Sequence, residues 1–213
     1  MPVPLVLASA SPARLATLRS AGIEPRVIIS HVDEDAALAA ARVANPALSA
    51  ADAALALARA KAEEVAATHA PGALVLGCDS ILEFEGEWLG KPGDAATVRD
   101  RWRAMRGRTG VLHTGHWLVD GRNPADGGAG GEAGETASTS VWFADLTDAE
   151  VDAYVATGEP LAVAGGFTVD GLGGPFVERI DGDHHNVVGL SLPLMRHLCA
   201  SIGVSIPELW SRP

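Results

Sequence analysis

The chain has 213 residues, of which 47% are hydrophobic and 20% are charged, and its formal net charge is −11 at pH 7. This composition is typical of a globular protein with enough chain for one large core. The acidic excess argues against a nucleic-acid polymer as partner, because such binding neutralises phosphates with lysine and arginine, and no apolar stretch reaches the length of a membrane helix.

The first half of the chain alternates predicted strands and helices. Short apolar runs predict strands, and capped or alanine-rich stretches predict helices. In chain order we expect a strand over residues 3–8, a helix over 12–21, a strand over 26–30, a helix over 48–69, a buried strand over 73–78, and a hairpin that begins at 81–84 and turns at 85–87.

Hairpins dominate the second half. Asp94 is expected to cap a helix to about residue 106, and the capping box of Thr147 and Glu150 opens another helix that stops at Gly158. The remaining expected elements are paired strands over 111–119 and 137–144, a flexible glycine-rich insert over about 120–135, strands over 165–169 and 176–180, and a last helix from about 193 to 203. This order predicts one α/β domain over residues 1–213 with a twisted mixed β-sheet flanked by helices.

Lysines are scarce in this chain. Lys61 and Lys91 are the only two, against fourteen arginines, and both lie near acidic or glycine-bearing segments. A compact ammonium fits where a planar guanidinium clashes, so these positions are candidates for a phosphate site. The alternative is that both are chance survivors on solvated helix faces.

A serine-rich turn connects the first strand to the first helix. Ser9, Ser11 and Arg14 lie where the N–H groups of a helix N-terminus are exposed, and such a turn favours an anion. The two hydroxyls add donors, and the guanidinium adds a charged fork. The alternative is that Ser9 or Ser11 is simply an N-cap.

Acidic residues follow two of the predicted strands. Asp33, Glu34 and Asp35 offer oxygen ligands for a hard divalent cation, although a solvated acidic turn is the commoner explanation. Asp79 follows the most apolar strand, where a carboxylate is costly to bury unless it is paired, metal-bound or functional. Ligands of open α/β sheets bind at such strand ends, so we expect a functional role for Asp79.

Other potential motifs carry less weight. Residues 165–174 hold five glycines, which allow close backbone approach to a ligand, but the spacing does not match a dinucleotide-binding fingerprint. His184 and His185 fall in an expected hairpin turn, and a structural zinc site is not expected. We expect Cys78 and Cys199 to be buried free thiols, as is usual in a reducing compartment. Because the N-terminal segment has no basic region typical of a signal peptide, we expect a cytoplasmic protein.

Taken in order, these motifs resemble the Maf family of nucleoside triphosphate pyrophosphatases. The resemblance covers about residues 5–194. It is carried by LASASPAR (7–14), VDE (32–34), ARAKA (58–62), GCDS (77–80), GKP (90–92), TGEPL (157–161), GGFTVDGLGGPFVERIDGD (165–183) and NVVGL (186–190). Each motif is weak alone, but together and in register they make the assignment strong.

The resemblance implies a two-lobed fold with a central cleft, and hydrolysis of a nucleoside triphosphate to a monophosphate and pyrophosphate. It implies Mg²⁺ or Mn²⁺ as cofactor, a nucleoside triphosphate as partner, and a homodimer. Carried over by position, the resemblance implies Asp79 as proton acceptor, Glu34 and Asp79 as metal ligands, and Ser9, Ser11, Arg14, Lys61, Lys91 and Asp170 as substrate-binding residues.

Four positions depart from the family pattern. Ala13 stands where many relatives carry arginine, Asp170 where they usually carry glutamine or glutamate, and Cys78 and Ser80 where alanine and threonine are commoner. These departures leave the preferred base open. Two alternatives also stay open: a nucleotide-binding regulator linked to septum formation that does not turn the nucleotide over, and a phosphatase acting on another phosphorylated metabolite.

Overall fold

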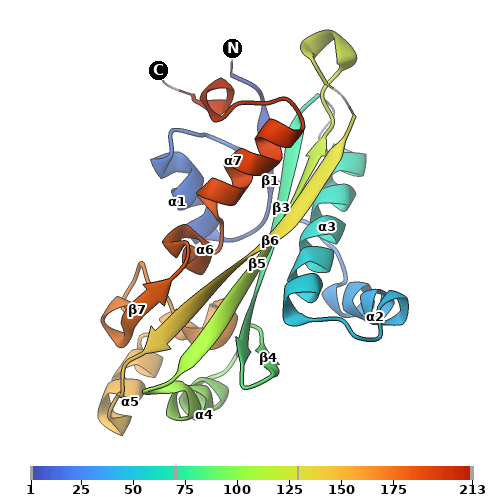
Figure 1. Ribbon diagram of the computed structural model, residues 1–213. Helices are drawn as coiled ribbons and strands as arrows, with labels where there is room; N and C mark the ends of the chain where they lie inside the picture. The colour runs from blue at the N-terminus through green and yellow to red at the C-terminus, as the bar shows by residue number, and fades with distance from the viewer. Residues whose placement is uncertain (1, 70–71, 129, 212–213) are drawn as a thin grey trace.

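The protein is built on one long mixed β-sheet. A computed structural model describes residues 2–69, 72–128 and 130–211 (Figure 1). The strands are β1 (Leu5–Ala8), β2 (Arg26–Val27), β3 (Leu74–Phe84), β4 (Glu87–Leu89), β5 (Thr109–Asp120), β6 (Glu132–Phe143) and β7 (Val177–Asp181). The helices are α1 (Pro12–Ser20), α2 (Glu34–Ala44), α3 (Ala50–His69), α4 (Ala95–Met105), α5 (Asp148–Ala156), α6 (His184–Val188) and α7 (Leu192–Ser201).

The sheet combines parallel and antiparallel pairs. In the described part of the chain the strand order is β2-β1-β3-β5-β6-β7, with β4 paired to the far end of β3. β1 runs parallel to β2 and β3, whereas β3, β5, β6 and β7 are antiparallel neighbours. The long helix α3 covers one face of the sheet, and α7 covers the other (Figure 1).

Two large hydrophobic clusters occupy opposite ends of the long strands. One cluster holds Leu7, Leu76 and Leu118 of the sheet with Leu198 of α7, and the other packs the opposite strand ends around Trp102 of α4. The rings around Trp102 meet edge to face, with centroids 5.5–5.9 Å apart. These clusters form two lobes, and the predicted two-lobed α/β class is confirmed.

The strand predictions were wrong in three places. β3 continues through Asp79 because Cys78, Asp79 and Ser80 keep their antiparallel pairing with β5, so Asp79 is inside a strand and not at its end. Residues 165–169 form no strand, since Gly165 and Gly166 have φ of 72° and 75°. The insert is shorter than expected, because β5 runs to Asp120 and β6 starts at Glu132.

Two helices were not predicted. Asp33 caps α2 by accepting the Ala36 N–H at 3.0 Å, so the acidic segment opens a helix and is not an isolated turn. His184 and His185 begin α6, capped by Asp183, and do not lie in a hairpin turn. The fully buried Asn186 anchors α6 by donating to the carbonyl of Leu112 at 3.1 Å.

Two glycines let α3 lie unusually close to the sheet. A Cβ at Gly77 would come within 2.2 Å of the Ala58 carbonyl oxygen, and one at Gly115 within 2.3 Å of the Ala54 carbonyl oxygen. Both glycines face α3, as does Asp79, which pairs with Gly115. The close approach therefore sets how far a side chain of α3 must reach to meet Asp79.

Replacing Gly77 by alanine is expected to lower the free energy of unfolding by about 1–3 kcal/mol, since the helix backbone must move away from the sheet. Urea denaturation of the full chain measures this change. Gly90→Ala is the matched control, because a Cβ there meets no atom within 4 Å, and we expect its stability to stay within about 1 kcal/mol of the parent. An equal loss in both variants would show that helix–sheet contact at Gly77 is not the cause.

Candidate active site

The predicted site residues line one cavity. This cavity has a volume of about 740 Å³ and lies between α1, β3 and the segment 159–171. The predicted residues on its wall are Ser9, Ser11, Arg14, Glu34, Lys61, Asp79, Lys91 and Asp170. A smaller hollow of about 260 Å³ beside Arg26 contains none of them, so the larger cavity is the candidate active site.

A lysine flanked by two carboxylates forms the charged centre of this site. Lys61 Nζ lies 2.5 Å from Asp79 Oδ1 and 2.7 Å from Glu34 Oε1. The Lys61 and Asp79 side chains are only 13% and 14% exposed, whereas Glu34 is 54% exposed. The three groups leave one net negative charge, which favours recruiting a cation.

Strand geometry explains why Asp79 is accessible from the cavity. β1 ends at Ala8, which pairs with Gly77, so β3 loses its parallel neighbour just before Asp79. On the other side, Asp79 is paired with Gly115 of β5, which has no side chain to cover it. The crevice predicted at a strand's carboxyl end therefore exists at the end of β1, beside the middle of β3.

Arg14 ties three segments of the site together. Its Nε donates to the Gly189 carbonyl at 2.7 Å, and its Nη1 donates to Ser9 Oγ at 3.0 Å and to the Cys78 carbonyl at 2.8 Å. Its Nη2 donates to Ser80 Oγ at 3.0 Å. Since a guanidinium has five N–H groups, four are used within the protein, and Arg14 fixes the site's walls with one N–H left for a ligand.

The serine turn is shaped from within. Ser11 caps α1, its Oγ accepting the Arg14 N–H at 3.4 Å, and Ser9 Oγ accepts the Ser11 N–H at 3.2 Å. The alternative of an N-cap thus holds for Ser11. Both serines also line the cavity, so capping and ligand contact are compatible here.

Glu34 and Asp79 suit a hard divalent cation. Their oxygens already meet on one positive group, the Lys61 ammonium, and carboxylate oxygens are the ligands that Mg²⁺ and Mn²⁺ prefer. Glu34 is the first residue of α2, a helix without buried residues, so its carboxylate can adjust to a ligand. The donor set therefore fits the expected metal.

Lys91 lies on the rim of the cavity and is exposed. It forms no ion pair with any residue in the described part of the chain. Its loop is held from both sides: the Gly90 carbonyl accepts Arg101 Nη1 at 2.5 Å and the Gly165 N–H at 3.3 Å, and the Gly93 N–H donates to the Leu161 carbonyl at 3.0 Å. This leaves an unpaired ammonium on a supported loop.

Glu159 organises the glycine-rich segment and was missed by the sequence analysis. Its carboxylate accepts the Thr168 hydroxyl at 2.5 Å, the N–H groups of Leu172 and Gly173 at 3.0 and 3.1 Å, and the Tyr154 hydroxyl at 3.1 Å. Burial alone would raise the pKa of Glu159, but these hydrogen bonds outweigh it and lower the pKa. The TGEPL motif marked this residue without revealing its partners.

Replacing Glu159 by glutamine is expected to lower stability at pH 7 by about 1 kcal/mol, after allowance for solvent screening, and to raise KM for the substrate. Because the folded-state pKa is depressed, the stabilisation by Glu159 is present above its ordinary pKa of 4.5 and is lost as pH falls through the folded value. Urea denaturation across pH checks this: the difference between the parent and Glu159→Gln should shrink on acidification. A constant difference would contradict the charged network.

Two buried groups near the site are unsuited to proton transfer or attack. Burial raises the pKa of the Cys78 thiol to about 12, so no thiolate is available next to Asp79. Burial lowers the pKa of His116 to about 4, and its Nε2 accepts the Ser191 N–H at 2.8 Å. His116 is therefore a neutral structural residue, and Asp79 remains the candidate base on the cavity wall.

Comparison with known proteins agrees with this site. A family model described as Maf-like protein matches residues 4–202. A Salinispora tropica protein named nucleoside triphosphate pyrophosphatase is 54% identical over 216 residues, covering 100% of this chain and 89% of that protein. A Streptomyces coelicolor protein of the same name is 53% identical, covering 97% and 94% of the two chains.

A solved structure of the Staphylococcus aureus Ham1 protein aligns with a TM-score of 0.41 at 12% identity, covering 97% of this chain and 93% of that one. The family model and the curated relatives span nearly the full length, and the range matched by the family model contains every segment on which the resemblance was based. The chain belongs to the Maf-like protein family.

Proposed function

We propose that this protein hydrolyses nucleoside triphosphates to a nucleoside monophosphate and pyrophosphate, an acid-anhydride hydrolysis. The observation that carries the proposal is the Lys61 ammonium held between Asp79 and Glu34 on the wall of a 740 Å³ cavity. Phosphoryl-type displacement needs charge neutralisation and an oriented nucleophile more than covalent help. Curated relatives that are 53–54% identical over nearly the whole chain carry the name nucleoside triphosphate pyrophosphatase.

Asp79 acts as the general base in this proposal. Its carboxylate faces the cavity, and one oxygen is fixed by Lys61 at 2.5 Å. Asp79 accepts a proton from the attacking water, which also orients that water toward phosphorus. The buried Cys78 and the neutral His116 do not compete for this role.

The cations and hydroxyls bind the substrate's phosphates. Lys61 and the unpaired Lys91 neutralise phosphate charge, and Ser9 and Ser11 donate hydroxyls at the N-terminus of α1. Arg14 holds this turn against β3 and α6 and offers its remaining N–H. Glu34 and Asp79 would hold Mg²⁺ or Mn²⁺, which when bound would neutralise negative charge on the phosphates.

The nucleobase of the substrate lies toward the glycine-rich segment, residues 165–174. Asp170 lines the cavity there, and Ala13 of α1 also lines the cavity. Ala13 is smaller than the arginine, and Asp170 shorter than the glutamine or glutamate, that the family pattern has at these positions. Both therefore leave more room in the cavity. We propose that these two positions and Ser80 decide which base is accepted, and that the substrates are non-canonical or surplus nucleotides.

Product analysis tests the proposal. A panel of standard and modified nucleoside triphosphates is incubated with the protein and Mg²⁺ or Mn²⁺, and products are separated by anion exchange. Pyrophosphate plus monophosphate is the expected result. Orthophosphate would indicate a phosphatase of another metabolite, and tight binding without turnover would indicate a nucleotide-binding regulator; either would overturn the proposal.

A cytoplasmic homodimer is the proposed state of the protein. Within the described residues, no helix combines the length and apolarity needed to cross a bilayer. Both cysteines are buried free thiols, which fits a reducing compartment. Sedimentation of the purified chain measures the oligomeric state.

A further inference from the structure

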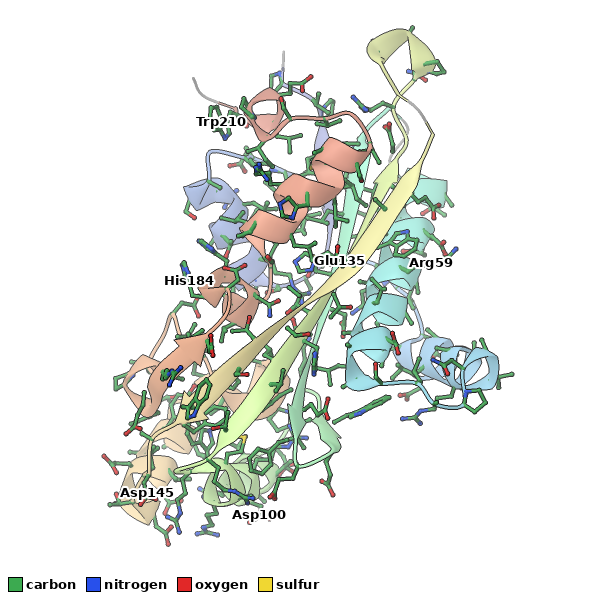
Figure 2. All side chains as sticks on the ribbon, in the orientation of Figure 1. Arg59, Asp100, Glu135, Asp145, His184 and Trp210 are labelled. Carbon is green, nitrogen blue, oxygen red and sulfur yellow. The ribbon has the colours of Figure 1, made fainter. Side chains whose placement is uncertain are left out.

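A cluster of two histidines and one aspartate lies outside the candidate active site. It sits at the corner where β7 leads into α6, and Figure 2 shows His184 on the outer side of this corner. Gly182 makes the corner with φ of 127°, in the left-handed region that favours glycine. Asp183, His184 and His185 follow directly, and none of them lines the 740 Å³ cavity.

The ligand atoms of these three residues converge. One carboxylate oxygen and one nitrogen from each ring lie within 4.8 Å of one another. His185 Nδ1 is 3.2 Å from Asp183 Oδ1, and the two imidazole rings are 3.8 Å apart between centroids. The two rings are tilted by 37° to each other, and a shared cation would hold both imidazole nitrogens at this corner.

Several ligand atoms in the cluster are unused. Asp183 Oδ2 is buried without a hydrogen-bond partner. Among the described residues, His184 makes no hydrogen bond through its ring, and His185 makes none through Nε2.

We infer that Asp183, His184 and His185 form a binding site for a borderline transition-metal ion, with Zn²⁺ as the best fit. Two imidazole nitrogens and one carboxylate oxygen suit Zn²⁺, Ni²⁺ or Co²⁺, whereas Mg²⁺ takes oxygen ligands. Three protein ligands leave an open coordination position for water or another group. This is a different chemistry from the oxygen-only pair Glu34 and Asp79.

The cluster is mechanically connected to the active site. α6 carries it at one end, and the carbonyl of Gly189, which follows α6, accepts Arg14 Nε at 2.7 Å. The buried Asn186 fixes the middle of α6 to β5 and β6. A metal at Asp183 therefore stiffens the segment against which Arg14 is oriented.

Zinc binding to the full chain tests the inference. Isothermal titration with Zn²⁺ is run in excess Mg²⁺, which occupies oxygen-only sites but does not compete for imidazole. We expect one Zn²⁺ per chain in the parent protein and loss of that binding in His184→Ala. His197→Ala is the matched control, since His197 is an exposed histidine on α7, and it should bind Zn²⁺ as the parent does.

A second measurement separates ligand loss from misfolding. NMR of the parent with Co²⁺ should broaden the ring resonances of His184 and His185 before those of the other histidines. His184 is exposed, so His184→Ala should keep the parent's thermal midpoint. Unchanged Zn²⁺ stoichiometry in His184→Ala, or first broadening at His31 or His197, would overturn the inference. Neither measurement depends on nucleotide turnover.

Discussion

Asp79→Asn should reduce the turnover number by about 10²–10⁴-fold, which corresponds to roughly 3–5 kcal/mol of transition-state stabilisation. The amide keeps the shape of the carboxylate but accepts no proton from water. It also removes the negative partner that lies 2.5 Å from Lys61 Nζ. Steady-state kinetics on the fastest substrate measures the loss, which should appear in kcat more than in KM.

Glu83→Gln is the matched control for Asp79→Asn. Glu83 is another carboxylate on β3, and its Oε2 lies 3.1 Å from His113 Nε2, away from the cavity. Its removal should leave turnover near that of the parent. Near-normal turnover in Asp79→Asn would contradict the base assignment, and equal losses in the two variants would point to damage of β3. Thermal melts of both variants show whether the fold is retained.

Much of the architecture is visible in the sequence because local signals agree with the tertiary fold. The capping box of Thr147 and Glu150 opens α5 as predicted, and both of its hydrogen bonds are present. The apolar run before Asp79 is a buried central strand as predicted. In these places propensity, patterning and packing all favour the same structure.

Predictions failed where long-range contacts override local signals. Asp79 stays in a strand because β5 pairs with it, although β1 has already ended. α6 is only five residues long and is held by Asn186, whose partners on β5 and β6 lie 74 and 47 positions away. No local pattern encodes such partners.

The candidate site was likewise predictable from local motifs but not in its long-range contacts. The motifs identified which residues line the cavity, but they did not show that Arg14 is largely occupied by protein acceptors or that Glu159 supports the glycine-rich segment. Backbone carbonyls such as those of Cys78 and Gly189 have no residue-specific signature. Only the folded geometry reveals them as partners.

We expect replacement of Lys61 to impair activity strongly, as the scarcity of lysine in this chain suggests. Its ammonium meets two carboxylate oxygens at 2.5 and 2.7 Å, and its side chain is 13% exposed. A guanidinium spreads the same charge over a wider plane and must displace Asp79 or Glu34 to fit. Arginine at this position therefore keeps the charge and loses the geometry.

We expect Lys61→Ala to lower kcat/KM by roughly 10²–10³-fold, the loss seen when one preorganised donor to a developing negative charge is removed. Lys61→Arg should recover little of it. Arg59→Ala is the matched control, because Arg59 is a half-exposed residue of α3 outside the cavity lining, where it pairs with Glu63 at 2.6 Å and lies 4.7 Å over the Trp117 ring (Figure 2), and its activity should stay near that of the parent. Nearly full activity in Lys61→Arg would show that charge suffices there. In that case position 61 would still contact phosphate through its charge, and the close approach of α3 at Gly77 would serve packing alone.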